Sequence, residues 1–334
     1  MVSSNSSNNE WTYTESDIAK KFSFFNLLKD GRIHVFTSLY ERAPPSDHPV
    51  TTPGVETKDI TISLTISARI FLPSSAATTT TTTNKLPLLV YFHGGGFCMQ
   101  SAFSVEYSLF VSQIVAEANV IAVSVEYRLF PKDCIPACYE DGWGAIQWVG
   151  LHCKGGGPEC WINDYADLGR VFVGGDSAGG NITHNLVAKV AEGLPENVRV
   201  EGMILIHPFF WEGEEMWMFM CPTNKGPKDP RLTPAVEDLA RMGCDRVLVL
   251  VAEKDDEHLY EAGKKYAENL IKSGWKGTVA ELMENKGKEH IFHLYDPLDP
   301  EAVAIRQRIS SFIHHHHPDN KHGNTDVLPC LNGF

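Results

Sequence analysis

The feature that most constrains the fold is a pentapeptide, Gly-Asp-Ser-Ala-Gly at positions 175–179, together with the segments on either side of it. A strand-like apolar run at 171–173 precedes it, and a helix-like run from Asn181 to Val190 follows it. In a sharp turn between a strand and a helix, glycines must flank the serine because the backbone is strained and neighbouring segments pass close. The pattern therefore predicts a nucleophile elbow that presents the hydroxyl of Ser177.

A glycine-rich loop upstream has the composition of an oxyanion-binding loop. The tetrapeptide His-Gly-Gly-Gly at 93–96 follows an apolar run, 86–92, which predicts a buried strand. Consecutive glycines let neighbouring backbone N–H groups point at one place, and the residue after the nucleophile adds another N–H. We expect the N–H groups of Gly94, Gly95 and Ala178 to form an oxyanion hole. The simpler alternative is a glycine-rich turn that binds nothing.

A serine nucleophile needs a base, and the base needs an acid that orients it. Downstream, the apolar run from Arg246 to Val251 predicts a strand that ends in an acidic loop. An acid at the carboxyl end of a parallel strand lies at the sheet edge where such folds build their sites. We expect Asp255 to be this acid, and Asp256 and Glu253 remain alternatives in the same loop.

The base is expected from the next strand and loop. The run from Val279 to Met283 predicts a strand, and the loop after it leads to His290. The order serine, acid, histidine is the one expected when the serine stands on such an elbow. We therefore predict that His290 takes the proton from Ser177 and returns it to the leaving group, with His293 as the competing candidate.

Strand-like and helix-like segments alternate from residue 86 onward, which predicts an α/β fold with a mostly parallel sheet and helices on both faces. The expected strands are 86–92, 120–125, 171–175, 200–206, 246–251 and 279–283, and the expected helices are 105–117, 137–151, 177–191 and 301–313.

The N-terminal part has weaker signals. Residues 16–28 are expected to form a short helix, Asp30-Gly31 a hairpin turn, and residues 60–72 one antiparallel edge strand. We predict a disordered tail at 1–14, a single domain at 15–313 and a low-complexity, histidine-containing tail at 314–334.

Composition limits the classes of partner. The 334-residue chain carries 29 basic and 42 acidic residues, a net charge of −13, which disfavours nucleic acid and anionic membranes as partners. It has no secretory signal pattern and no run of eighteen apolar residues, so we expect a cytoplasmic protein without a membrane span. None of its eight cysteines forms a C-x₂-C pair, and we expect neither a metal site nor a cofactor.

These motifs together resemble the plant carboxylesterases of the hormone-sensitive-lipase-like group. The resemblance runs from about residue 24 to 313 and rests on HGGGF at 93–97, EYRL at 126–129, GDSAGGN at 175–181, VAEKD at 251–255 and EHIFHL at 289–294. It implies an α/β-hydrolase fold with an N-terminal cap element, to which about 15–45 and 209–225 would contribute. It also implies the triad Ser177, Asp255 and His290, with no metal.

The resemblance implies a serine carboxylesterase acting on small to medium esters of plant specialised metabolites, as a monomer or homodimer. The same family includes 2-hydroxyisoflavanone dehydratases, alkaloid cyclases and gibberellin receptors, so elimination or cyclisation in the same pocket is the main alternative. A receptor-like role is less favoured because His290 is present. The segment 209–222 is shorter than in the family pattern. Candidate pocket residues are Phe97, Met99, Phe103, Trp211, Trp217 and Ile291.

Overall fold

A computed structural model of the chain describes residues 12–36, 40–45, 53–78, 85–194 and 198–314. These residues belong to two compact units, 1–38 and 39–334. The boundary falls inside the range 15–313 that the sequence analysis assigns to one domain. Most of the two predicted tails lies outside the described residues, although His314 is the last residue of a helix. The contribution of residues 15–45 to a cap stays a prediction.

The first unit is a small antiparallel sheet, which corrects the predicted helix at 16–28. A 3₁₀ turn (Glu15–Asp17) leads into β1 (Ile18–Lys21), β2 (Phe25–Leu28) and β3 (Ile33–Val35). The predicted hairpin turn is confirmed, because Gly31 has φ 88° and β2 pairs with β3 across it. In a short isolated helix over residues 16–28, Phe25 and Leu28 would have no partner element to pack against. In the observed sheet, strand β2 buries both side chains.

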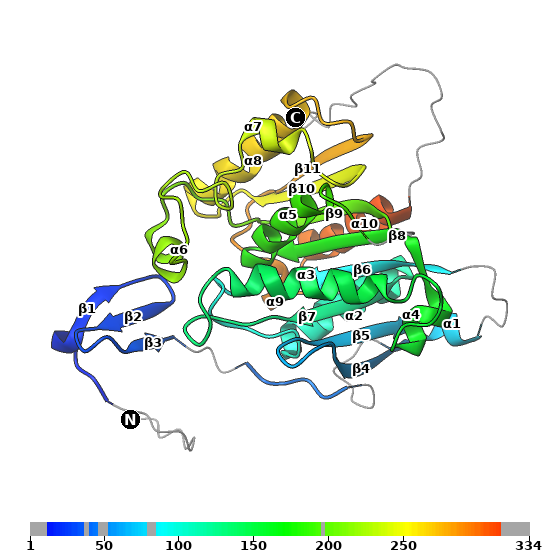
Figure 1. The fold of residues 1–334 in the computed structure, drawn as a ribbon, viewed down its shortest axis with the longest axis horizontal. Coiled ribbons are helices and arrows are strands. Elements are labelled where there is room, and N and C mark those ends of the chain that lie inside the picture. The colour runs from blue at the N-terminus through cyan, green and yellow to red at the C-terminus, as the bar shows by residue number, and fades with distance from the viewer. Residues whose placement is uncertain (1–11, 37–39, 46–52, 79–84, 195–197, 315–334) are drawn as a thin grey trace. The chain divides into compact units, whose positions relative to one another are not determined.

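The second unit contains an eight-stranded sheet in the order β11-β10-β9-β8-β6-β7-β5-β4 (Figure 1). Pairing is parallel from β11 to β7 and antiparallel at β5 and β4, so the predicted mostly parallel sheet is confirmed. The strands are β4 (Val55–Thr61), β5 (Ser67–Pro73), β6 (Leu86–Phe92), β7 (Ile121–Glu126), β8 (Ala166–Asp176), β9 (Val200–Ile206), β10 (Arg246–Ala252) and β11 (Val279–Asn285).

The predicted single strand at 60–72 is wrong. It is a hairpin of β4 and β5, and its turn is held by the hydroxyl of Ser63, which accepts the N–H groups of Thr65 and Ile66. Leu64 at the tip is fully exposed. Alternation of side chains continues on both sides of a short turn, so the pattern alone does not locate the reversal.

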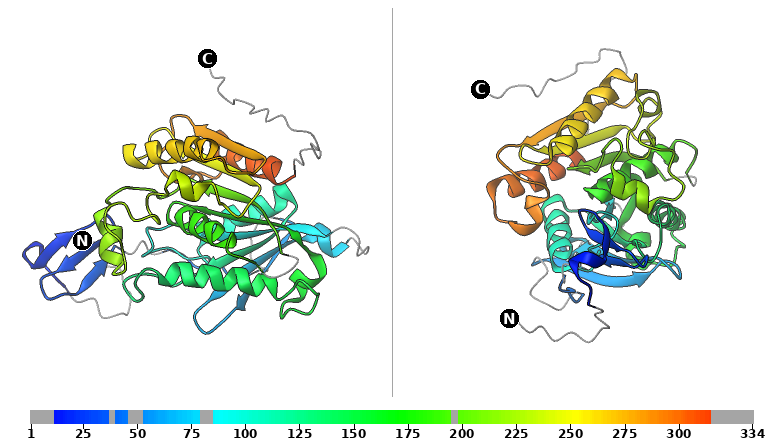
Figure 2. Two further views of the ribbon diagram at one scale, coloured as in Figure 1. Left: turned by 45° about the horizontal axis from the view of Figure 1, so that its top comes forward. Right: turned by 90° about the vertical axis from the view of Figure 1, so that its left-hand side faces the viewer.

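Helices cover both faces of this sheet (Figures 1 and 2). Helices α2, α9 and α10 pack against one another, and α3 packs against α5, which lies on β8 and β9. The helices are α1 (Ser74–Thr78), α2 (Val105–Ala118), α3 (Ala137–Gly150), α4 (Cys160–Tyr165), α5 (Ala178–Val190), α6 (Glu215–Met220), α7 (Val236–Leu239), α8 (Glu257–Lys272), α9 (Phe292–Tyr295) and α10 (Pro300–His314). Among the described helices, none has the length and apolar character that crossing a membrane requires.

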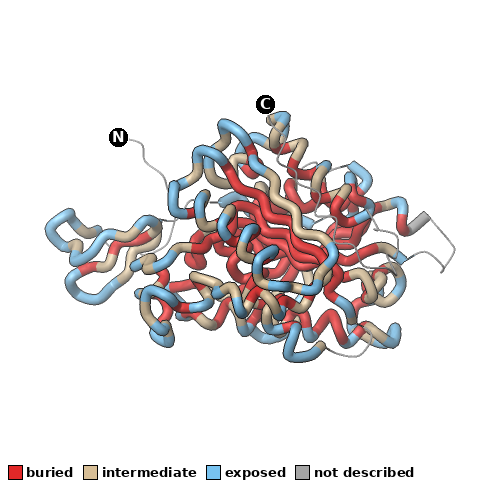
Figure 3. The backbone as a smooth tube through the Cα atoms, turned by 90° about the horizontal axis from the view of Figure 1, so that it is seen from above, coloured by how far each residue is buried: buried red, intermediate tan, exposed pale blue. Residues whose placement is uncertain are grey.

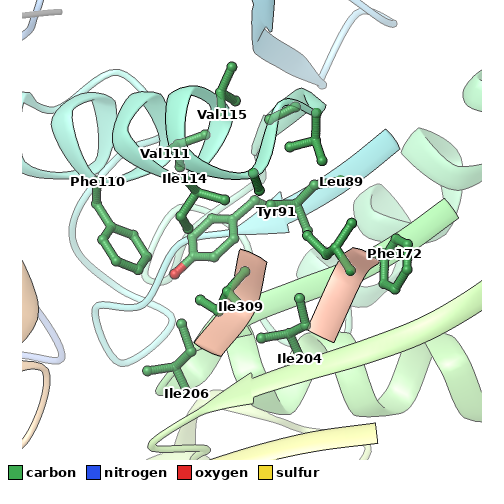
Figure 4. Close-up of a cluster of buried hydrophobic side chains, with 14 of the residues drawn as sticks. Leu89, Tyr91, Phe110, Val111, Ile114, Val115, Phe172, Ile204, Ile206 and Ile309 are labelled. Atoms are coloured by element: carbon green, nitrogen blue, oxygen red, sulfur yellow. The ribbon is translucent and has the colours of Figure 1, made fainter. Parts of the chain in front are cut away.

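The main hydrophobic core lies between the sheet and the helices α2 and α10 (Figure 4). Phe110 and Ile114 from α2 and Ile309 from α10 meet Phe172 and Ile204 from the sheet, and all are nearly inaccessible to water. Buried side chains of this kind contribute roughly 1.5–3 kcal/mol each. The strands in the middle of this unit are buried along their length (Figure 3), so the polar groups of the site can lie only at the strand ends and the loops that follow.

Candidate active site

The pentapeptide forms a strained turn between β8 and α5. Ser177 has φ 51° and ψ −118°, a conformation that L-residues rarely adopt, and its N–H donates to the carbonyl of Ile206 at 2.9 Å. A Cβ atom added to Gly179 would lie 2.0 Å from the carbonyl oxygen of Phe92, and one added to Gly175 would lie 2.6 Å from it. Only glycine therefore lets β6 and the turn approach this closely.

The histidine and the acid expected from the sequence lie beside this serine. His290 Nε2 is 2.9 Å from Ser177 Oγ, and His290 Nδ1 is 2.6 Å from Asp255 Oδ2. Because a carboxylate only accepts, Nδ1 carries the proton and Nε2 is left to accept the serine hydroxyl. The other oxygen of Asp255 accepts the N–H of Asp256 at 2.7 Å. The Asp255 side chain is 3% exposed and that of His290 28%, so the imidazole alone of this pair reaches solvent.

The three rival candidates are engaged elsewhere. Asp256 caps α8 by accepting a helix N–H, and Glu253 accepts the N–H of Gly287 at 2.6 Å. His293 is fully buried against the ring of Phe110, with the ring centroids 4.6 Å apart. Neither of its nitrogens has a hydrogen-bond partner among the described residues.

The glycine loop departs from expectation at its first glycine. The N–H of Gly94 donates to the hydroxyl of Tyr107 at 2.7 Å, so this hydrogen is already engaged and the expectation for Gly94 as an oxyanion donor needs correction. Within the described part of the chain, no hydrogen bond engages the N–H of Gly95, Gly96 or Ala178. The available donors are therefore the second and third glycines of the loop and the residue after the serine.

A buried carboxyl group connects the loop and the elbow. Asp176 is completely buried, and the hydroxyls of Tyr91 and Tyr107 each donate to one of its oxygens at 2.7 Å. Burial raises the pKa of Asp176 to about 6, and the two tyrosine hydrogen bonds work against this rise. Asp176 lies inside the sequence motif but had no predicted role there, and neither Tyr91 nor Tyr107 was among the predicted site residues.

His207, directly after β9, is a further residue for which the sequence predicted no role. Its Nδ1 accepts the N–H of Ile291, directly after His290, at 3.0 Å, and its Nε2 is 3.3 Å from Asn285 Oδ1. The side-chain amide of Asn285 in turn donates to Glu301 at 3.1 Å. Burial, and next the nearby His290, lower the pKa of His207 to about 4, so its imidazole is neutral. Its place at a parallel-strand end was the available signal.

The six candidate pocket residues differ in their surroundings. Phe97 is buried and meets Phe209 edge to face, with centroids 5.8 Å apart. Trp211 is half-buried and stacks on His258 at 4.7 Å. Met99 and Ile291 are also half-buried.

Two other members of that set pack against arginines. The ring of Phe103 lies under the guanidinium of Arg42 at 4.1 Å. The fully buried ring of Trp217 lies 5.0 Å from the guanidinium of Arg231. Side chains enclosed in this way are poorly placed to meet a substrate. The pocket assignment stays a prediction for all six residues.

Three side chains lie close enough together to share a metal ion: the ligand atoms of His207, Asp255 and His290 are within 4.8 Å of one another. His207 already uses both ring nitrogens, toward the Ile291 N–H and Asn285, and His290 uses both toward Ser177 and Asp255. A metal would have to break several of these bonds, so the donor set suits proton transfer better than metal binding.

Comparison with known proteins identifies the family of the chain. A family model described as the alpha/beta hydrolase fold matches residues 89–216. The chain is 40% identical to probable carboxylesterase 13 of Arabidopsis thaliana, over 90% of this chain and 98% of that protein. It is 39% identical to a 2-hydroxyisoflavanone dehydratase of Glycyrrhiza echinata, again over 90% and 98%.

A solved esterase from Pseudomonas putida superposes with a TM-score of 0.64 at 23% identity, over 81% of this chain and 86% of that one, which is a likeness of fold. The fold and the serine–histidine–acid arrangement define an α/β hydrolase. The chain belongs to the plant carboxylesterase group of that class, as the sequence motifs predicted.

Proposed function

We propose that the chain is a serine carboxylesterase that hydrolyses small to medium carboxylic esters through an acyl-enzyme. One observation carries the proposal: the hydrogen-bond path from Asp255 through His290 to Ser177, with distances of 2.6 and 2.9 Å. The carboxylesterases among its relatives support the same activity.

In the first step, Ser177 Oγ attacks the ester carbonyl carbon while its proton passes to His290 Nε2. Asp255 keeps the imidazole in the required tautomer and stabilises it when it becomes charged. The protonated His290 then gives its proton to the departing alcohol, and the acyl group stays on Ser177 as an ester. Water then loses a proton to His290 and attacks this ester. As the intermediate collapses, His290 returns that proton to Ser177 Oγ, the bond between Oγ and the acyl carbon breaks, and the carboxylic acid is released.

The negative charge of each tetrahedral intermediate needs donors that are already in place. We assign this role to the N–H groups of Gly95, Gly96 and Ala178, which have no other hydrogen bond among the described residues. An aimed donor of this kind lowers the barrier by about 3 kcal/mol.

The experiment is hydrolysis of p-nitrophenyl acetate, butyrate and octanoate by the wild type and by Ser177→Ala. The wild type should turn these esters over, and the rate of Ser177→Ala should be lower by at least about 10³-fold, because the nucleophile is gone. Circular dichroism and thermal unfolding should show that the variant stays folded. The profile across acyl chain lengths measures the size of the acyl pocket. Turnover that survives in Ser177→Ala would contradict the proposal.

A second candidate function is elimination of water from a plant metabolite, with His290 as the base. The observation that favours it is the 39% identity to a 2-hydroxyisoflavanone dehydratase. Incubation with 2-hydroxyisoflavanone, followed by mass spectrometry for loss of one water, separates the two functions.

The finer features of the proposal come from the resemblance and from composition. We take the substrates to be esters of plant specialised metabolites, and residues 15–45 and 209–225 to contribute a cap over the pocket. We further propose a cytoplasmic monomer or homodimer that needs no metal, cofactor, membrane or nucleic acid. Size-exclusion chromatography with light scattering tests the oligomeric state.

A further inference from the structure

The first glycine of the loop, Gly94, is held by hydrogen bonds at both its N–H and its carbonyl oxygen. Its N–H donates to Tyr107 Oη at 2.7 Å. Its carbonyl oxygen accepts His93 Nδ1 at 2.8 Å and lies 3.4 Å from the hydroxyl of Tyr127. The hydroxyl of Tyr127 also donates to the carbonyl of His93 at 2.7 Å. The rings of His93 and Tyr127 stack, with their centroids 4.3 Å apart. Two consecutive peptide groups of the loop are therefore anchored by ring side chains.

Anchoring Gly94 determines the direction of the next N–H. The carbonyl of Gly94 and the N–H of Gly95 belong to one planar trans peptide unit and point in opposite directions. A hydrogen bond that fixes the carbonyl therefore also aims the N–H. Gly95 has φ 100°, and a Cβ there would lie 2.2 Å from the carbonyl oxygen of Met99. The unit has little room to rotate.

Asp176 links this anchored loop to the nucleophile. The hydroxyl of Tyr107 accepts the Gly94 N–H and donates its own proton to Asp176 Oδ2 at 2.7 Å. Asp176 directly precedes Ser177 in the chain. Tyr107 and Asp176 are buried, where hydrogen bonds are stronger than in water and polarise one another. One carboxyl group thus sets the distance between the oxyanion loop and the elbow.

We propose that Tyr107, held by Asp176, and Tyr127 are positioning residues. They fix the 93–94 peptide group, and together with His93 Nδ1 on the Gly94 carbonyl they aim the Gly95 N–H at the oxyanion of the transition state. The inference rests on the proposed esterase function and adds to it which side chains keep the donors in place. Neither tyrosine needs to touch the substrate. Their loss should lower transition-state stabilisation and leave substrate binding unchanged.

The chain offers a matched control for Tyr107. Tyr91 donates to the other oxygen of Asp176, also at 2.7 Å, and its ring is buried in the hydrophobic core (Figure 4). Within the described residues, its hydroxyl makes no hydrogen bond with the glycine loop. Tyr91→Phe and Tyr107→Phe therefore remove the same group from the same carboxyl group, and only the second releases Gly94.

The experiment measures kcat and KM for p-nitrophenyl butyrate and for its thionoester, in which sulfur replaces the carbonyl oxygen. Sulfur is a weak hydrogen-bond acceptor, so the ratio of the two rates reports on the oxyanion donors. Tyr107→Phe should lower kcat for the ester by about 10- to 100-fold at unchanged KM, with a smaller loss for the thionoester. Tyr91→Phe should stay within about threefold of the wild type for both substrates.

Equal losses in Tyr91→Phe and Tyr107→Phe, or an unchanged ester-to-thionoester ratio in Tyr107→Phe, would overturn the inference. If Tyr107→Phe does not fold, Tyr127→Phe decides, because it releases the His93 carbonyl, which belongs to the same peptide group as the Gly94 N–H that Tyr107 holds, and it should lower the same ratio. An unchanged ratio there has the same negative meaning. Absence of wild-type turnover, or turnover that survives in Ser177→Ala, would instead contradict the proposed esterase function, and the inference about the tyrosines would fail together with it.

Discussion

The two sides of the candidate site are held in different ways. On the loop side, His93, Tyr107 and Asp176 are all at most 1% exposed and lie in a hydrogen-bond network that is buried away from water. On the other side, the His290 side chain is 28% exposed and depends on single contacts from Asp255 and on the backbone behind it. The difference follows the work of each side: oxyanion donors must not move, whereas a base must meet both the leaving alcohol and the incoming water.

Each side nevertheless contains one buried, neutral histidine that holds a backbone group. Burial lowers the pKa of His93 and of His207 to about 4. His93 Nδ1 faces the carbonyl of Gly94 and must donate, whereas His207 Nδ1 faces the N–H of Ile291 and must accept. The two imidazoles therefore have opposite tautomers, and each is selected by the peptide group that it holds.

The largest effect is expected from the acid on the exposed side. Asp255→Asn should lower kcat/KM by about 10³- to 10⁴-fold, because the amide can donate to Nδ1 and so favours the wrong tautomer of His290. Glu253→Gln is the control, since that side chain accepts a backbone N–H and does not reach His290. It should change kcat/KM by less than about threefold. A large loss in the control with a small loss in Asp255→Asn would reverse the choice of acid.

A smaller loss is expected when the backbone behind His290 is released. Ile291 has φ 48°, which is unfavourable for a β-branched residue, and its N–H is held by His207 Nδ1. His207→Leu removes this acceptor, so the loop should relax and kcat should fall by about 10- to 100-fold.

His207→Asn is the matched variant, because its side-chain oxygen can take the place of Nδ1. It should recover most of the activity lost in His207→Leu, and KM should stay constant in both. A pH–rate profile adds a readout that a loss of stability alone would leave unchanged. Equal activity of His207→Leu and wild type would show that the exposed side needs no such support.

The parts of the site that the sequence predicted are those carried by short motifs at strand ends. Ser177, Asp255 and His290 each follow a predicted strand, and parallel strands bring their carboxyl ends to one edge. The hydrogen bond of the Gly94 N–H could not be predicted, because its partner Tyr107 lies on helix α2, beyond the loop that follows the glycines. The same holds for His207 and Ile291, which are 84 positions apart. Motifs report local geometry, whereas these contacts depend on how distant segments pack.

The fold shows the same division between local and long-range information. Many of the segments in which strand and helix alternate were predicted closely, as β6 at Leu86–Phe92 shows, whereas β8 begins at Ala166 instead of the predicted 171 and the helix α8 at Glu257–Lys272 was not predicted. Residues 16–28 form strands because β2 finds partners on both sides in β1 and β3. Pairing of this kind overrides the weak helical pattern of a short segment.

The smallest effect concerns how stability depends on pH, and it compares the two buried histidines directly. In the unfolded chain each has a pKa near 6.5, and in the folded chain about 4. Below pH 6.5 these two histidines therefore bind protons in the unfolded state but not in the folded state. The free energy of unfolding falls as the pH is lowered from 6.5 to about 4. At pH 5 each histidine costs about 2 kcal/mol relative to pH 7.

Asp176 works in the opposite direction, because burial raises its folded pKa to about 6 from 3.8. Its protonation in the folded state recovers about 1.4 kcal/mol at pH 5, so the wild type should still lose stability on acidification. Urea unfolding at pH 7 and pH 5 measures this loss, which should be about 2 kcal/mol smaller in His207→Asn and in His93→Asn. If only one of the two variants shows the smaller loss, only that side of the site holds its histidine neutral.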